Sequence, residues 1–378
     1  MSKTVVKGLI RSLSRTSRYW EKPTSEFLDF TSLAFFAFKY FSECTLKWDD
    51  FDLHWKEILT PNKKYCDIQK WSGNTRAQSL IRRIFLERKY GSSAVMKAAV
   101  DRFCDPSYLP QREEVVEFFD MKDWTRNPEG EDARKDQLLR SLKSEDDSIA
   151  GWSLEDILES AGCCIYGRNE FNWFCERFER YEFLTSTYID ALSAYIKERA
   201  VAENNEESDF IVLEVGAGSG VLSESLQAQL RDENILIVAT DPNYWKLKKH
   251  FHVDRFNYNE AVKMFQPNIV IASWMPLGED WTRDMRAAGV KEYILIGEAD
   301  GGCCGDPWKT WGIHGNATSK HLQPPFRVDG YDKVYLETLS AVQLQRYDSA
   351  HWNQNSQTVS FRMVNDYEVG HTHRSNEL

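Results

Sequence analysis

The chain has 378 residues, of which 42% are hydrophobic and 28% charged, and its formal net charge is −11. This length allows one large domain or two ordinary ones, and the acidic balance argues against nucleic acid as a partner, because sequence-independent binding needs a positive surface field. The longest apolar stretch, residues 33–41, is interrupted by Lys39 and is too short to span a bilayer, so we expect no membrane span.

The N-terminus and the cysteines indicate the cellular compartment in which we expect the protein. Residues 1–20 contain five basic residues and no acid. We interpret them as a short basic surface helix of a cytoplasmic protein, with a mitochondrial transit peptide as the alternative. The eight cysteines form no C-x-x-C pair, and no secretory signal is visible, so we expect reduced intracellular thiols. His250 and His252 lack supporting ligands in register, so no metal site is predicted.

Residues 1–180 show the patterns of helices. Apolar residues recur at helical spacing in 26–41 and again in 74–90. Further along, Ser153 and Asp156 have the spacing of a capping box. We therefore predict a mainly helical N-terminal region over residues 1–180.

The pattern changes after residue 180. A helix is expected over residues 184–199, followed by short apolar runs separated by helical or polar stretches. The runs that we predict to be strands are 210–215, 235–240, 268–272, 293–297, 333–339 and 358–363, with a further one around 253–258. Buried strands that alternate with helices indicate an α/β domain over residues 181–378, with a mostly parallel sheet and an antiparallel hairpin at its C-terminal edge.

A glycine-rich turn joins the first of these strands to a helix. Gly216, Gly218 and Gly220 follow the apolar run directly, and Glu214 precedes them. Dinucleotide-binding loops use a related G-x-G-x-x-G spacing, but here the third glycine comes one residue early. The arrangement resembles motif I of class I S-adenosylmethionine-dependent methyltransferases.

This resemblance implies a Rossmann-like, seven-stranded sheet and S-adenosyl-L-methionine as the cofactor. The implied cofactor-binding residues are Glu214, Gly216, Ala217, Gly218, Gly220, Asp241, Pro242, Asn257 and Ser273. Glu214 would hold the amino-acid portion of the cofactor. Asp241 ends the second apolar run and would accept hydrogen bonds from the ribose hydroxyls. Asn257, together with Asp254 and Tyr258, is a candidate for the adenine.

The methyl group would lie near the segment after the fourth strand. That segment reads Ser273-Trp274-Met275-Pro276, which lacks the acid or amide and the second proline of enzymes that methylate nucleobase amino groups. Trp274, Trp281, Trp308 and Trp311 are candidates for an aromatic wall or for the core. The candidate catalytic residues are Trp274, Glu298, Asp300 and His314, of which the last three are candidate bases.

The sequence therefore predicts a methyltransferase that acts on a small molecule or a protein. The helical N-terminal region would cap the cofactor cleft and supply substrate specificity. Two alternatives stay open, an NAD(P)-dependent oxidoreductase and a catalytically silent binding scaffold. The oligomeric state is not predicted.

Overall fold

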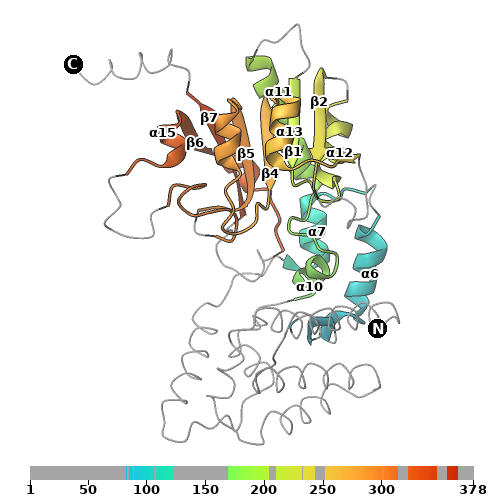
Figure 1. Cartoon of the computed structure of the whole chain (residues 1–378). Coiled ribbons are helices and arrows are strands. Elements are labelled where there is room, and N and C mark those ends of the chain that lie inside the picture. Colours follow the sequence, from blue (N-terminus) through green and yellow to red (C-terminus); the bar gives the residue numbers. More distant parts are fainter. Residues whose placement is uncertain are drawn as a thin grey trace, which may run out of the picture. The chain divides into compact units, whose positions relative to one another are not determined.

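The computed structural model describes residues 82, 85–87, 89–105, 108–121, 169–203, 210–231, 233–242, 252–300, 302–313, 322–346 and 356–364 (Figure 1). The basic N-terminus, the helix expected over 26–41 and the capping box at Ser153 lie outside these residues. Between 82 and 90 the described residues are helical, as predicted for the helix over 74–90. Residues 94–126 and 169–378 form one compact unit, and residues 1–93 and 127–168 form another.

A seven-stranded sheet forms the centre of the larger unit, in the order β3-β2-β1-β4-β5-β7-β6. The strands are β1 (Phe210–Val215), β2 (Ile235–Thr240), β3 (Val253–Asp254), β4 (Ile269–Ser273), β5 (Glu292–Glu298), β6 (Tyr331–Tyr335) and β7 (Ser356–Met363). Strands β1 to β5 pair in parallel, whereas β7 is antiparallel to both of its neighbours. The predicted Rossmann-like sheet with a reversed C-terminal hairpin is confirmed.

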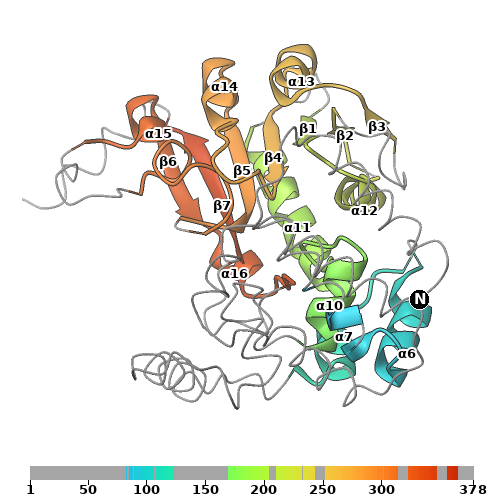
Figure 2. The same ribbon diagram turned by 60° about the horizontal axis from the view of Figure 1, so that its bottom comes forward.

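Helices cover both faces of this sheet (Figure 2). On one face are α13 (Tyr258–Phe265), α14 (Thr282–Ala287) and α15 (Pro325–Val328), and on the other are α11 (Ser186–Ala202), α12 (Val221–Gln229) and α16 (Glu337–Ser340). Alternation along β1 explains the two cores, because Leu213 and Val215 pack with the first set and Val212 packs with the second. The central strands β1, β4 and β5 are buried on both faces, as their apolar runs predicted.

Three helices from the N-terminal half belong to the same compact unit as the sheet. They are α6 (Ala94–Phe103), α7 (Arg112–Phe118) and α10 (Glu170–Arg177). Their contact is largely aromatic: the Phe103 ring centroid lies 5.6 Å from that of Phe183 and 6.3 Å from that of Phe174. The expected division into domains at residue 180 stays a prediction.

The strand predicted over 333–339 differs from the structure. Strand β6 ends at Tyr335, and α16 begins at Glu337. The apolar run continues because Leu336 and Leu339 are buried on the face that α11 and α12 cover, although the backbone has already turned into a helix. A short apolar run does not by itself distinguish a strand from a buried helical turn.

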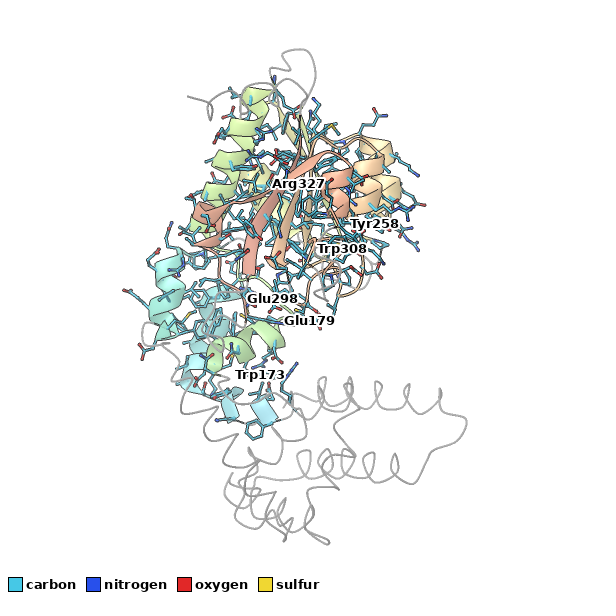
Figure 3. All side chains as sticks on the ribbon, turned by 90° about the vertical axis from the view of Figure 1, so that its left-hand side faces the viewer. Trp173, Glu179, Tyr258, Glu298, Trp308 and Arg327 are labelled. Carbon is cyan, nitrogen blue, oxygen red and sulfur yellow. The ribbon has the colours of Figure 1, made fainter. Side chains whose placement is uncertain are left out.

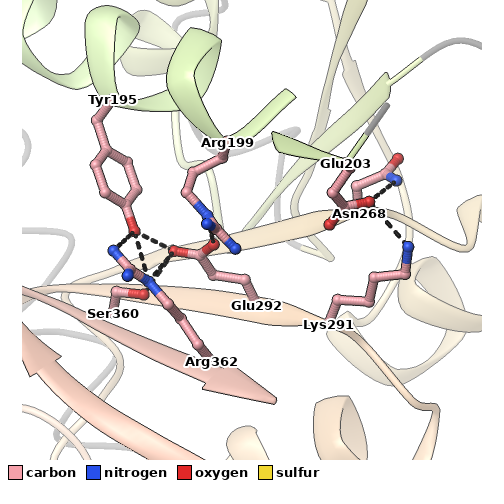
Figure 4. Close-up of polar contacts among 8 residues, drawn as sticks. All are labelled: Tyr195, Arg199, Glu203, Asn268, Lys291, Glu292, Ser360 and Arg362. Atoms are coloured by element: carbon pink, nitrogen blue, oxygen red, sulfur yellow. Dashed lines mark hydrogen bonds and ion pairs between the residues drawn. The ribbon is translucent and has the colours of Figure 1, made fainter. Parts of the chain in front are cut away.

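The two ends of the sheet carry different chemistry. Figure 3 shows Glu298 at the carboxyl end of β5 and Arg327 nearer the opposite end. At the amino end of β5, Glu292 is 1% exposed and accepts hydrogen bonds from Arg199 Nε at 2.6 Å and Ser360 Oγ at 2.5 Å (Figure 4). Tyr195 also donates to Glu292, and Arg362 Nε lies 3.6 Å from its carboxylate. Glu292 thus connects α11 to β5 and β7.

No helix in the part of the chain that the structure describes is long and apolar enough to cross a membrane.

Candidate functional site

The carboxyl ends of the parallel strands meet along one edge of the sheet. β1 pairs in parallel with β2 and β4, and β4 pairs in parallel with β5. The residues that follow these strands are therefore neighbours at that edge, which is where open α/β sheets bind their ligands. Most of the predicted site residues that the structure describes come from these four strand ends.

The glycine-rich turn after β1 has the backbone that its sequence predicted. Gly216, Gly218 and Gly220 have φ angles of 67°, 59° and 80°, in the left-handed region that a side chain disfavours. The Gly220 amide donates to Ala217 O at 2.9 Å, and the Ala217 amide donates to Thr240 O at 3.0 Å. The turn is thereby fixed to the end of β2, and Gly220 leads directly into α12.

Asp241 lies beside this turn. Its Oδ2 accepts a hydrogen bond from the Gly218 amide at 3.1 Å. The carboxylate is thus positioned by the middle glycine of the loop, at the tip of β2. Its role toward a ribose stays a prediction, as does that of the adjoining Pro242.

Glu214 points to the other side of β1, under the turn. It is 3% exposed, and its Oε2 accepts hydrogen bonds from the amide and the hydroxyl of Ser223 at 3.1 and 2.5 Å. Burial raises the pKa of Glu214 to about 7, against the opposing effect of the Ser223 hydrogen bonds. The acid therefore anchors the first turn of α12, a contact that the sequence analysis did not predict.

The raised pKa of Glu214 has a consequence for stability. Between about pH 4.5 and pH 7 the folded chain retains a proton that the unfolded chain releases, so the Glu214 contribution to the free energy of unfolding decreases as the pH rises through this window and is constant above it. Glu214→Gln carries no such charge. We expect the variant to gain stability relative to wild type from pH 5 to pH 8, by about 3 kcal/mol at most.

Urea unfolding at several pH values measures this difference. Glu224→Gln, which replaces an exposed acid on the same helix, is the control. Parallel stability curves for wild type and Glu214→Gln would contradict the interpretation.

The indole of Trp281 lies against the first glycine, and the Tyr258 ring stacks on that indole. Trp281 and Tyr258 are stacked, with centroids 5.1 Å apart and planes 14° apart. A Cβ added at Gly216 would lie 2.9 Å from Cη2 of Trp281. The indole can approach the turn this closely only because position 216 is a glycine. Asn257 is exposed and precedes α13, where its amide donates to Glu260 Oε2 at 3.2 Å in a capping box. Its predicted contact with adenine is untested.

Ser273 ends β4, and Trp274 turns the chain away from it. Trp274 has a φ of 55°, and its amide donates to Ile296 O at 2.8 Å. Its indole Nε1 donates to Glu182 Oε1 at 3.0 Å, and its ring lies 5.1 Å from that of Tyr181. Glu182 and Tyr181 are missed by local sequence patterns because they come from the segment before α11.

The candidate acids after β5 are both engaged. Glu298 Oε2 accepts a hydrogen bond from the Cys303 amide at 3.0 Å. Asp300 pairs with Lys333 Nζ, and its Oδ2 accepts a hydrogen bond from Tyr335 OH at 2.9 Å. Glu298 thus closes its own loop and Asp300 ties that loop to β6, and their roles as bases stay predictions. His314 lies outside the described residues.

The four candidate tryptophans have different surroundings. Trp274 and Trp281 lie at the carboxyl edge of the sheet, as described above. Trp311 is 2% exposed and donates from Nε1 to Cys304 O at 2.6 Å, so it is a core residue. Trp308 is half-buried in the loop after β5. Among the described residues, no group of three His, Cys, Asp or Glu side chains could hold a metal ion.

The reversed β7, the strand order and the glycine turn after β1 define a Rossmann-like α/β fold. No family model and no curated protein matches the sequence. Solved structures of methyltransferases do match it. Human N-acetylserotonin methyltransferase in complex with SAM is 11% identical with a TM-score of 0.29, over 75% of this chain and 70% of that one.

Two further matched structures are also methyltransferases. The CMeT domain of citrinin polyketide synthase is 13% identical with a TM-score of 0.33, over 90% of this chain and 97% of that one. The CurJ carbon methyltransferase is 9% identical with a TM-score of 0.30, over 82% and 98%. At these identities the similarity concerns the fold alone.

Proposed function

We propose that the chain is an S-adenosylmethionine-dependent methyltransferase that acts on a small-molecule or protein acceptor. The observation that carries the proposal is the edge formed by β1 and β2. There, three left-handed glycines follow β1, whose penultimate residue is Glu214, and Asp241 is held on the amide of Gly218. Such a turn brings backbone close to a ligand, and the acid at the next strand suits ribose hydroxyls.

The charges at this edge suit a cationic cofactor. Asp241 lies beside the turn, where its carboxylate accepts a hydrogen bond from the Gly218 amide. The indole of Trp281 lies against Gly216, and an aromatic face attracts a cation. A sulfonium and an ammonium group would gain from these surroundings, whereas a pyrophosphate would meet the carboxylate of Asp241.

Each predicted residue then has a task. When bound, S-adenosylmethionine supplies an electrophilic methyl group on a sulfonium sulfur. The turn from Gly216 to Gly220 would accommodate its amino-acid portion, Asp241 would orient the ribose, and Asn257 and Pro242 would contact the adenine. Ser273 and Trp274 would face the methyl group and align the acceptor, and alignment alone can provide most of the rate.

A base is needed only where the acceptor must lose a proton. Glu298 lies at the carboxyl end of β5, next to the strand that carries Ser273 and Trp274. Among the described candidates it is the base that we favour. To act as a base, its carboxylate would have to accept the proton of the acceptor. Its Oε2 would then either keep the hydrogen bond from the Cys303 amide or give it up.

Calorimetry tests the cofactor directly. We expect S-adenosylmethionine and S-adenosylhomocysteine to bind and NAD not to bind. Binding of NAD without binding of S-adenosylmethionine or S-adenosylhomocysteine would instead support an oxidoreductase.

A labelled-methyl transfer screen of cell-extract fractions then tests activity. Incorporation of label into one fraction is the expected result, and it identifies the acceptor. Cofactor binding without transfer to any fraction would favour a binding scaffold.

A further inference from the structure

Three side chains from separate segments form a row next to the end of β4. The guanidinium carbon of Arg346 lies 4.1 Å from the centroid of the Tyr181 ring, and the Tyr181 ring lies 5.1 Å from that of Trp274 at 37°. Tyr181 is 47% exposed. We call Tyr181, Trp274 and Arg346 the aromatic–arginine platform.

Backbone contacts hold Arg346 against Tyr181. The Arg346 amide donates to Tyr181 O at 3.1 Å, and Glu182 and Gln345 form an antiparallel bridge beside it. Asn172 of α10 is fully buried and donates from Nδ2 to Arg346 O at 2.5 Å. Arg346 is therefore positioned by a buried amide as well as by the bridge.

A second set of polar contacts holds Trp274. Its indole donates to Glu182 Oε1, which also accepts hydrogen bonds from Gln343 Nε2 at 3.0 Å and Ser356 Oγ at 2.5 Å. Trp274 keeps a left-handed φ of 55°, which is unfavourable for a bulky residue. Backbone strain of this kind persists where the surrounding contacts impose it, and it is concentrated at functional sites.

We propose that the aromatic–arginine platform binds the methyl acceptor, and that the acceptor is a flat aromatic compound with an anionic group. This proposal rests on the proposed function, because it takes the end of β4 as the side that faces the methyl group. The exposed part of Tyr181, next to Trp274, offers aromatic contact area at little entropic cost. A guanidinium both stacks on rings and pairs with a carboxylate through two parallel hydrogen bonds.

Three probes test separately whether binding needs a flat aromatic ring and whether it needs an anionic group. 2-Naphthoate is flat and anionic, decahydro-2-naphthoate is anionic but not flat, and 2-naphthylmethanol is flat but neutral. Each is titrated by calorimetry into the full chain, with and without S-adenosylhomocysteine. We expect 2-naphthoate to bind at least about tenfold more tightly than the other two.

Variants test the residues. Tyr181→Ala and Arg346→Gln should each weaken 2-naphthoate binding about tenfold, and Tyr181→Phe should restore it. The matched controls are Tyr108→Ala and Arg327→Gln, which replace another exposed tyrosine and another exposed arginine. Urea unfolding of every variant is measured to check that the fold is retained.

Equal 2-naphthoate affinity for wild type and both platform variants would overturn the proposal, as would failure of 2-naphthoate to bind wild type. Equal affinity for all three probes would overturn the assigned chemical class. If S-adenosylhomocysteine does not bind but 2-naphthoate binds with the expected dependence on Tyr181 and Arg346, the proposed function fails and the platform remains a binding site.

Discussion

Gly218→Arg is expected to abolish binding of S-adenosylmethionine, with a loss of affinity of more than about a hundredfold, or about 2.7 kcal/mol. Gly218 has a φ of 59°, and its amide donates to Asp241. An arginine there strains the turn, displaces that amide and adds a positive charge beside a cationic cofactor. Calorimetry with S-adenosylmethionine and S-adenosylhomocysteine measures the effect.

Gly289→Arg is the matched control. Gly289 also has a left-handed φ, of 73°, but it follows α14 and an added Cβ would meet no atom within 4 Å. Both variants should lose about 1–2 kcal/mol of stability from backbone strain, and only Gly218→Arg should lose the cofactor. If Gly218→Arg binds the cofactor with wild-type affinity, the glycine turn is not part of the cofactor-binding site.

Glu292→Gln is expected to have the largest effect on stability, a decrease of about 3 kcal/mol in the free energy of unfolding. The substitution keeps the shape of the side chain but removes a buried charge that pairs with Arg199 and lies near Arg362 (Figure 4). Both arginines would then lack their carboxylate. The two arginine side chains are 26% and 33% exposed, so water can partly replace the lost carboxylate. The expected loss of stability is therefore at the lower end of the range for a broken buried ion pair.

Glu233→Gln provides the comparison. Glu233 pairs with Lys197 at 3.0 Å, but both side chains are more than 40% exposed. Exposed pairs of this kind contribute about 0–1 kcal/mol. Equilibrium urea unfolding should therefore separate the two variants, and equal losses would show that Glu292 is not the main connection between α11 and the sheet.

The parts of the fold that the sequence predicted depend on local patterns. The strands β1, β4 and β5 are largely apolar because they are buried on both faces, and the turn after β1 is marked by its glycines. The end of β6 was placed wrongly because Leu336 and Leu339 keep the run apolar beyond the strand.

The contacts of the site could not be predicted in the same way. Ser223 lies nine positions after Glu214, and no local pattern links the two residues. The hydrogen bond between them was therefore not predicted. Tyr181 and Arg346 are far apart in the sequence and carry no motif. Long-range contacts of this kind arise from the packing of whole elements, which a local pattern does not encode.

The position of β7 affects how the domain can form during synthesis. Among the described strands β7 is the last to be made, yet it lies inside the sheet between β5 and β6. Until residue 363 has left the ribosome, β5 is an unpaired edge and β6 has no partner strand. A growing chain at this stage exposes an edge that can pair with other chains, so folding of the domain is tied to the completion of this segment.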